Sequence, residues 1–152
     1  MVNKLRDLPL ICIFNNYIFI MNNKDIVEKN KTIAKFLGFE YKTYQEVGNR
    51  FAGWRTSLSE LNYDLAKNFG AISRVDYLWL CRNNNELKFH NSWEWIIESY
   101  GYCLNESFGL NDECKNKFNV LKERLLFNIS NIEKENSYMV LCEIIELLKL
   151  NS

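Results

Sequence analysis

The chain has 152 residues, of which 47% are hydrophobic and 25% are charged, the size and composition of one folded domain. Its 19 basic and 19 acidic side chains cancel, so no overall positive field draws the protein to nucleic acid. The five cysteines are widely spaced and accompany a single histidine, which fits neither a zinc site nor a disulfide framework. We therefore expect a cytoplasmic protein with free thiols, no metal and no cofactor.

Residues 8–21 (LPLICIFNNYIFIM) are apolar, yet this run is shorter than the roughly 20 residues of a membrane span, and Asn15 and Asn16 interrupt it. No small-residue cleavage site follows, as a signal peptide would require. We therefore expect no membrane association. Met21 opens a segment typical of a protein start, and residues 21–152 are expected to form a single domain. Two interpretations of residues 1–20 remain open: an upstream extension or an extra β-strand.

The first predicted helix has Asp25 as its N-cap and ends at Gly38, because glycine favours the left-handed conformation that follows many helices. Residues 39–41 alternate apolar and polar side chains and predict a short strand. Apolar residues at helical spacing then predict a second helix from Ser57 to Gly70.

Residues 75–81 and 86–90 carry the clearest strand signal in the chain. They surround a polar turn at residues 83–85, where asparagine tolerates the left-handed conformations that hairpin turns require. The pattern predicts an antiparallel hairpin over residues 75–90. A helix is expected to follow, capped by Asn91 or Ser92 and ending at Gly101, with residues 102–104 as a further strand.

The rest of the chain has the apolar spacing of two amphipathic helices. The stripe of the last helix is expected to pack against the sheet, or alternatively to form the seam of a homodimer; it consists of Tyr138, Leu141, Cys142, Ile145 and Leu148. The predicted fold is therefore α+β, a small antiparallel sheet packed against several helices, with a C-terminal amphipathic helix.

Residues 77–95 (YLWLCRNNNELKFHNSWEW) resemble a family of small, uncharacterised phage and prophage proteins. That family shares a strand, a polar turn, a second strand and a helix start of the form HxSWDWL. Residues 33–41 (IAKFLGFEY) and the closing helix from Ser137 are similar to its flanking blocks. The chain lacks the proline that members commonly carry after the tryptophan pair. The family has no established activity, so the resemblance implies only an accessory protein of a virus or integrated virus, inside a bacterial host cell.

Arg82, His90, Asn91 and Ser92 form the first candidate ligand site. His90 lies at a predicted helix start, where free backbone amides and the partial positive charge of the helix end attract anions. With Arg82 across the predicted hairpin, the group could hold a phosphate or a carboxylate. The alternative is structural, with Asn91 and Ser92 capping the helix and His90 in a local hydrogen bond.

Trp54 and Arg55 form the second candidate site, in a predicted loop between the first strand and the second helix. An aromatic ring beside a guanidinium could stack on a base or a nucleotide ring, or the tryptophan could simply close one end of the core. No catalytic residue is expected, because no cysteine has the surroundings of an activated thiol and no phosphate-loop, zinc-hydrolase or serine-hydrolase motif occurs.

These observations favour a non-catalytic interaction module, a phage-type accessory protein that binds a host protein. The alternative is a binder or sponge of a small anionic ligand such as a nucleotide, in an anti-defence role. An enzyme of unknown class is the third interpretation. A basic pocket lined with aromatic residues would favour ligand capture, whereas a flat exposed apolar surface would favour a protein partner.

Overall fold

The computed structural model describes residues 10–14, 17–47, 52–58, 63–74 and 76–152, and at residues 10–14 and 17–20 it describes the backbone alone. Over these residues the fold is α+β, as the sequence predicts. A four-stranded antiparallel sheet has the order β3 (Glu40–Lys42), β4 (Gly53–Ser57), β6 (Tyr77–Cys81), β5 (Ile72–Ser73). A separate antiparallel pair consists of β1 (Leu10–Phe14) and β2 (Tyr17–Met21).

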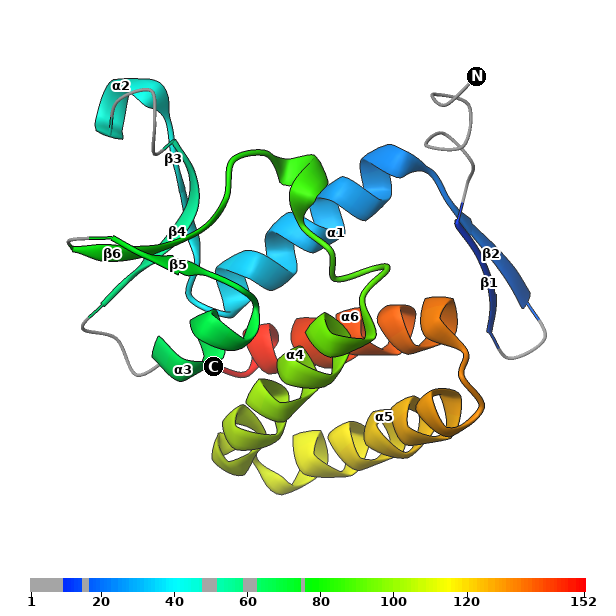
Figure 1. The fold of residues 1–152 in the computed structure, drawn as a ribbon. Coiled ribbons are helices and arrows are strands. Elements are labelled where there is room, and N and C mark those ends of the chain that lie inside the picture. The colour runs from blue at the N-terminus through cyan, green and yellow to red at the C-terminus, as the bar shows by residue number, and fades with distance from the viewer. Residues whose placement is uncertain (1–9, 15–16, 48–51, 59–62, 75) are drawn as a thin grey trace, which may run out of the picture.

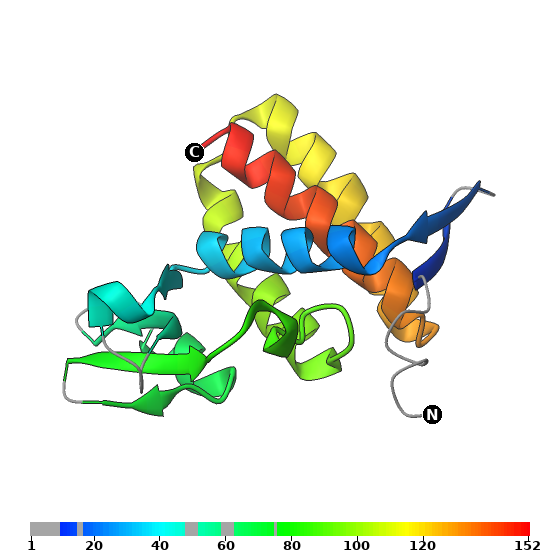
Figure 2. The same cartoon turned by 90° about the horizontal axis from the view of Figure 1, so that it is seen from above.

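The described helices are α1 (Asn23–Phe36), α2 (Tyr44–Val47), α3 (Tyr63–Asn68), α4 (Trp93–Glu106), α5 (Asp112–Ser130) and α6 (Lys134–Leu150). Two short 3-10 turns, η2 (Asn84–Glu86) and η3 (Ser107–Gly109), lie between them. Figures 1 and 2 show α1 extending from the β1–β2 pair at one end of the molecule to the four-stranded sheet at the other. None of these helices is long and apolar enough to cross a membrane.

The last helix, α6, forms the centre of the helical layer, where it contacts α1, α4 and α5. The predicted apolar stripe is buried throughout, from Tyr138 at 0% exposed to Cys142 at 4%. The elements that pack most closely on α6 are these helices and strand β1, and not the strands of the four-stranded sheet, so the expected packing of the stripe against that sheet is wrong. The stripe is also not available as the seam of a homodimer.

Helix α1 begins earlier than predicted, at an N-cap supplied by Asn22 rather than Asp25. The Asn22 side-chain oxygen accepts a hydrogen bond from the backbone NH of Asp25 at 2.9 Å, which places Asp25 inside the first turn. The predicted end of the helix is confirmed, since Gly38 has φ 89° and follows the last turn. Strand β3 then confirms the short strand predicted nearby.

Strand β6 confirms the first strand of the predicted hairpin, but residues 86–90 are not a strand. Both edges of β6 are already paired, with β4 and with β5, so neither is free for residues 86–90. Instead η2 turns the chain, and Leu87 and Phe89 enter the core with 0% of their surface exposed. The alternation of these residues with exposed Lys88 therefore reflects burial without strand pairing.

Strand β4 occupies the region that the sequence analysis assigns to a loop, so the loop placement of Trp54 and Arg55 is wrong. Successive side chains of a strand point to opposite faces of the sheet. Trp54 and Thr56 are accordingly buried, while Arg55 is half-buried on the other face.

A β-bulge in β6 decides which of its residues face the core. Trp54 pairs with Cys81 while the next residue, Arg55, pairs with Trp79, so Leu80 is the extra residue of β6. Leu80 and Cys81 are consequently both buried, at 8% and 6% exposed. Trp79 remains half-buried on the opposite face.

The second predicted helix is shorter than expected because Ser57 is the last residue of β4. Residues 59–62 of that prediction lie outside the described part of the chain. Helix α3 follows, and Gly70, with φ 85°, ends it as predicted.

Ser92, one of the two N-caps that the sequence predicts, caps helix α4, but the helix does not end at Gly101. It continues to Glu106, so the predicted strand at residues 102–104 is also wrong. Gly101 lies on the exposed side, whereas the buried face continues through Cys103 at 0% exposed. Burial of that face outweighs the roughly 1 kcal/mol that a glycine costs a helix interior.

An aromatic cluster joins the sheet end of the core to α4. The ring centroid of Phe69 lies 6.1 Å from that of Phe39, 5.7 Å from Phe89 and 5.2 Å from Trp95. Phe89 and Trp95 are 4.7 Å apart, and all four contacts are edge-to-face, the arrangement that aromatic rings prefer.

Gly53→Ala is expected to destabilise the protein by at least about 3 kcal/mol, because φ is +132° and a Cβ would overlap the carbonyl oxygen of Cys81 and lie 2.8 Å from the Cα of Arg82. Chemical denaturation measures the change. Gly101→Ala is the control, since a Cβ there meets nothing within 4 Å, and it should stabilise α4 by about 0.5–1 kcal/mol. Equal effects of the two substitutions would contradict the close pairing of β4 with β6.

Trp95→Ala is expected to cost about 3–5 kcal/mol of unfolding free energy, because the side chain is 7% exposed within the aromatic cluster. Trp93→Ala should cost distinctly less, since Trp93 is half-buried at the edge of the core. Thermal and denaturant unfolding of both variants test the difference, and similar losses would place the wrong face of α4 on the core.

Removal of residues 1–20 is expected to leave cooperative unfolding intact. The β1–β2 pair belongs to a sheet separate from the four-stranded one, and the truncated chain keeps Met21, which is 1% exposed in the core. Thermal melts of the two chains provide the measurement. Because β1 also contacts α6, loss of a cooperative transition would show that this contact is part of the fold.

Candidate functional site

The predicted hairpin does not form, so the first candidate site is not assembled as the sequence analysis expects. Arg82 follows β6 and is exposed, and its backbone NH donates to Oε2 of Glu86 at 3.1 Å. Since residues 86–90 are not a strand, the pairing expected to set Arg82 opposite His90 does not form. A carboxylate, which repels anions, lies beside Arg82 instead.

Asn91 and Ser92 contact the start of α4 and its neighbour α6. Oγ of Ser92 accepts a hydrogen bond from the backbone NH of Trp95 at 3.3 Å, the contact of an N-cap. The carbonyl of Asn91 accepts from Nζ of Lys134 at 3.3 Å, and the same ammonium lies 5.7 Å from the ring of Trp93. The structural interpretation therefore holds for Ser92, which caps the helix, whereas the contact of Asn91 with Lys134 is made by its backbone carbonyl and is not a cap.

His90 lies in a polar cluster whose other members come from distant parts of the chain. Nδ2 of Asn30, on α1, is 2.9 Å from Nδ1 of His90 and also donates to the carbonyl of Leu87 at 3.0 Å. The hydroxyl of Tyr138, on α6, donates to Oδ1 of Asn30 at 3.0 Å. The cluster therefore joins α1, the segment before α4, and α6.

Burial lowers the pKa of His90 below its ordinary value of 6.5, so the imidazole is neutral at neutral pH. A neutral ring attracts an anion far less than an imidazolium does. Together with the position of Glu86, this weakens the case for a phosphate or carboxylate at the start of α4.

Trp54 and Arg55, the second candidate pair, point to opposite faces of the sheet. Trp54 is 0% exposed, and its indole Nε1 donates to the side-chain oxygen of Asn84 at 2.9 Å. Its ring also makes an edge contact with Tyr41 at 5.7 Å. The ring is therefore part of the core and is not available to stack on a nucleotide, and the two residues do not form one site.

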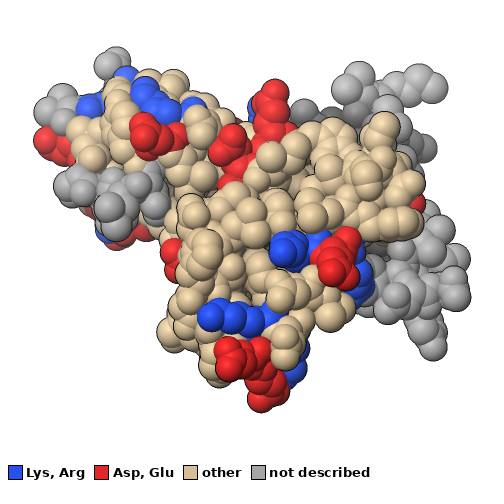
Figure 3. Space-filling view, turned by 90° about the horizontal axis from the view of Figure 1, so that it is seen from below, with Lys and Arg blue, Asp and Glu red and all other residues tan. Residues whose placement is uncertain are grey.

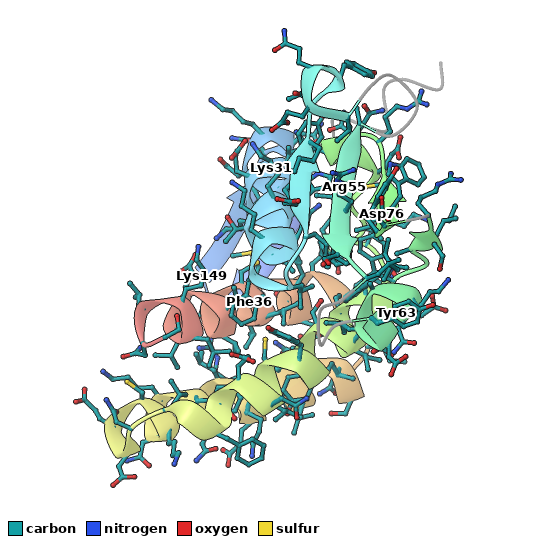
Figure 4. The ribbon with its side chains drawn as sticks, turned by 90° about the vertical axis from the view of Figure 1, so that its left-hand side faces the viewer. Lys31, Phe36, Arg55, Tyr63, Asp76 and Lys149 are labelled. Carbon is teal, nitrogen blue, oxygen red and sulfur yellow. The ribbon has the colours of Figure 1, made fainter. Side chains whose placement is uncertain are left out.

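Arg55 instead belongs to a group of side chains on the outer face of the sheet. Register places Arg55 directly opposite Trp79, which in turn lies opposite Ile72 on β5. The guanidinium of Arg55 lies 4.3 Å from the ring centroid of Tyr77, a cation–π contact. We call Arg55, Tyr77, Trp79 and Ile72 the outer-face cluster. Figure 4 shows Arg55 on the strands, apart from Phe36 and Lys149 on the helices.

The outer-face cluster is only partly exposed at its centre and more open at one edge. Trp79 and Tyr77 are half-buried, and Nε1 of Trp79 donates to the carbonyl of Ala52 at 3.4 Å, which fixes the indole. Ile72, on the edge strand, is 48% exposed. The cluster therefore presents two half-buried aromatic side chains with one basic side chain stacked on one of them.

Charges of both signs border this surface. Register places Glu40 opposite Arg55 on the β3 side, and Nζ of Lys42 lies 3.3 Å from the Glu40 carboxylate. The pKa of Glu46 is lowered, chiefly by hydrogen bonds from Thr43 and further by the charges of Lys42 and Arg55. The face of the molecule in Figure 3 likewise shows acidic and basic side chains close together with uncharged surface between them. No polyanion is favoured by such a balance.

The buried thiols have the opposite chemistry to catalytic cysteines. Desolvation raises the pKa of Cys81 and that of Cys142 to about 12, and it raises the pKa of Cys103 further. All three are therefore protonated at neutral pH. Among the described residues, no group of three or more histidine, cysteine, aspartate or glutamate side chains is placed to hold a metal ion.

The outer-face cluster could have been found from two signals in the sequence. Residues 53–57 (GWRTS) place tryptophan and threonine, which both favour strands, two positions apart, a signal for a strand at the place where the sequence analysis expects a loop. Tyr77 and Trp79 stand two apart in the strand that was predicted correctly and therefore share a face. The distant partners of His90 have no comparable local signal.

Comparisons of the chain with protein-family models, with curated proteins and with solved structures gave no match.

Proposed function

We propose that this protein is a non-catalytic accessory module of phage type, which binds a protein of the bacterial host cytoplasm through the outer-face cluster. The observation that carries the proposal is the meeting of Trp79, Tyr77 and Arg55 on one side of the sheet. Tryptophan, tyrosine and arginine are the residue types that most often dominate the binding energy of protein interfaces.

The fixed geometry of these side chains supports a protein partner. The Arg55 guanidinium is held on the Tyr77 ring, and the Trp79 indole is held by the carbonyl of Ala52. A side chain that is already ordered loses less conformational entropy when a partner covers it. The surrounding Glu40 and Lys42 supply a polar border, as interfaces between proteins usually have.

A small anionic ligand such as a nucleotide is the alternative, with weaker support. Arg55 is the basic side chain of the outer-face cluster, and the carboxylates of Glu40 and Glu46 lie close to it. His90 is neutral near pH 7, and Arg82 has the Glu86 carboxylate beside its backbone NH. An enzyme remains the third interpretation, with Cys81, Cys103 and Cys142 held as protonated thiols.

A photocrosslinking amino acid at position 72 tests the proposal, since Ile72 is exposed and lies opposite Trp79. The protein is expressed in bacteria and irradiated in the cell. We expect a covalent adduct of discrete mass with one host protein. The same crosslinker at position 108 should give no such adduct, because Phe108 is 81% exposed but lies on η3, outside the sheet.

Trp79→Ala, introduced beside the crosslinker, should reduce the adduct at least tenfold, since truncation of such a tryptophan costs about 2 kcal/mol or more of binding energy. Arg55→Ala should also reduce it, and Val120→Ala, on the exposed face of α5, is the matched control. Thermal melts verify that each variant is folded. No adduct at position 72, or an adduct of equal yield in folded Trp79→Ala, would contradict the proposal.

A further inference from the structure

The carboxamide of Asn30 is buried and held by hydrogen bonds at both ends. The residue is 1% exposed; its Nδ2 faces the Leu87 carbonyl at 3.0 Å and the His90 ring nitrogen at 2.9 Å, while its Oδ1 accepts from the Tyr138 hydroxyl at 3.0 Å. Rotation of the amide by half a turn would set Oδ1 against the Leu87 carbonyl, so two oxygen atoms would face each other without a proton. The network therefore assigns the amide orientation.

This orientation determines where His90 carries its proton. Nδ2 of Asn30 donates, so Nδ1 of His90 must accept, and the proton of the neutral ring resides on Nε2. A second proton would have to enter at Nδ1. There it would meet the NH₂ group of Asn30, a donor against a donor, and the hydrogen bond would be lost.

We propose that Asn30, His90 and Tyr138 form a proton-sensitive latch, which holds residues 90–92 against α1 and α6 while His90 is neutral and releases them when Nδ1 takes up a proton. The ring is half-buried, so it can turn outward to solvent once it is charged. Leu87 and Phe89 are fully buried and anchor the chain just before this segment. Release therefore concerns chiefly residues 90–92, which include the N-cap of α4.

The groups around the cluster do not offer His90 a countercharge. On α6, Lys134 is a cation, and the Cys142 thiol near Tyr138 is protonated, with a pKa of about 12. On α1, the neighbours of Asn30 are engaged elsewhere, Lys29 with Glu146 and Lys31 with Glu28. Lys88, just before the segment, is an exposed cation. Over the described residues no carboxylate has a hydrogen bond or ion pair with His90.

The sign of the pH effect follows from these contacts. The released histidine has its ordinary pKa of 6.5 and the latched histidine has a lower one, because burial disfavours the charged ring. The latch is therefore at full strength above pH 6.5 and weakens as the pH falls from there through the lower value. Between the two pKa values, the opening constant should rise about tenfold for each pH unit.

The single histidine of the chain makes the test direct, since its ring protons give one unambiguous set of NMR signals. The titration of His90 and the exchange protection of the backbone amides of Asn91 and Ser92 are measured from about pH 7.5 to about pH 5. Both amides donate to the carbonyl of Lys88, at 3.1 Å and 2.9 Å. We expect a titration below pH 6.5 and, after correction for intrinsic exchange, protection that falls with the pH at these amides.

His90→Gln should abolish the pH dependence of protection at these amides. Asn30→Asp replaces the facing donor by a carboxylate, so the pKa of His90 should move above 6.5 and protection should rise as the pH falls. Asn119→Asp, exposed on α5, is the matched control and should shift neither.

Tyr138→Phe removes the hydroxyl that fixes Oδ1 of Asn30, so the titration of His90 should move upward from that of the parent even if Asn30→Asp fails to fold. The latch is refuted if protection of Asn91 and Ser92 in the parent does not change with pH, if it changes equally in His90→Gln, or if Tyr138→Phe leaves the titration where it was.

Discussion

The antiparallel pairing of β4 with β6 is the constraint on which the rest of the structure depends. Gly53 allows the two backbones to approach each other closely. The bulge at Leu80 shifts the register, so that the side chains of β6 after it point to the opposite face from the one that strict alternation would give. Residues before the bulge can present Tyr77 and Trp79 to the outer face. Residues after it leave the sheet and turn into the helical layer. One local irregularity thus separates an outward aromatic surface from an inward polar cluster.

The sequence predicts those features that depend on near neighbours. Glycine at positions 38 and 70 and the hydroxyl of Ser92 mark helix ends through contacts within a few residues, and all three are confirmed. The strand predicted at residues 86–90 is wrong because the alternation of apolar and polar side chains shows which residues are buried. It does not show whether a neighbouring strand is there to pair with them. That information lies in the pairing of β6 with β4 and β5, which no local pattern reports.

In the candidate sites, too, the sequence predicts what depends on near neighbours and misses what depends on distant contacts. The sequence suggests one site of Arg55 with its neighbour Trp54, yet adjacent residues of a strand face opposite ways, and the aromatic neighbours of Arg55 come from β6. For His90 the sequence predicts either a bound anion or a local hydrogen bond, but its partner is the distant Asn30, which Tyr138 holds in turn. In both cases the residue type was informative and the partner depended on tertiary structure.

The edges of the four-stranded sheet are short, three residues in β3 and two in β5. A longer open edge would offer unpaired backbone groups to another chain and invite fibre growth, a hazard that natural sheets commonly avoid by shortening the strand at the edge. An aromatic surface in this protein can therefore remain partly uncovered without backbone-mediated self-assembly. On this sheet the side chains of the outer face, more than open backbone edges, are the groups that a partner would meet.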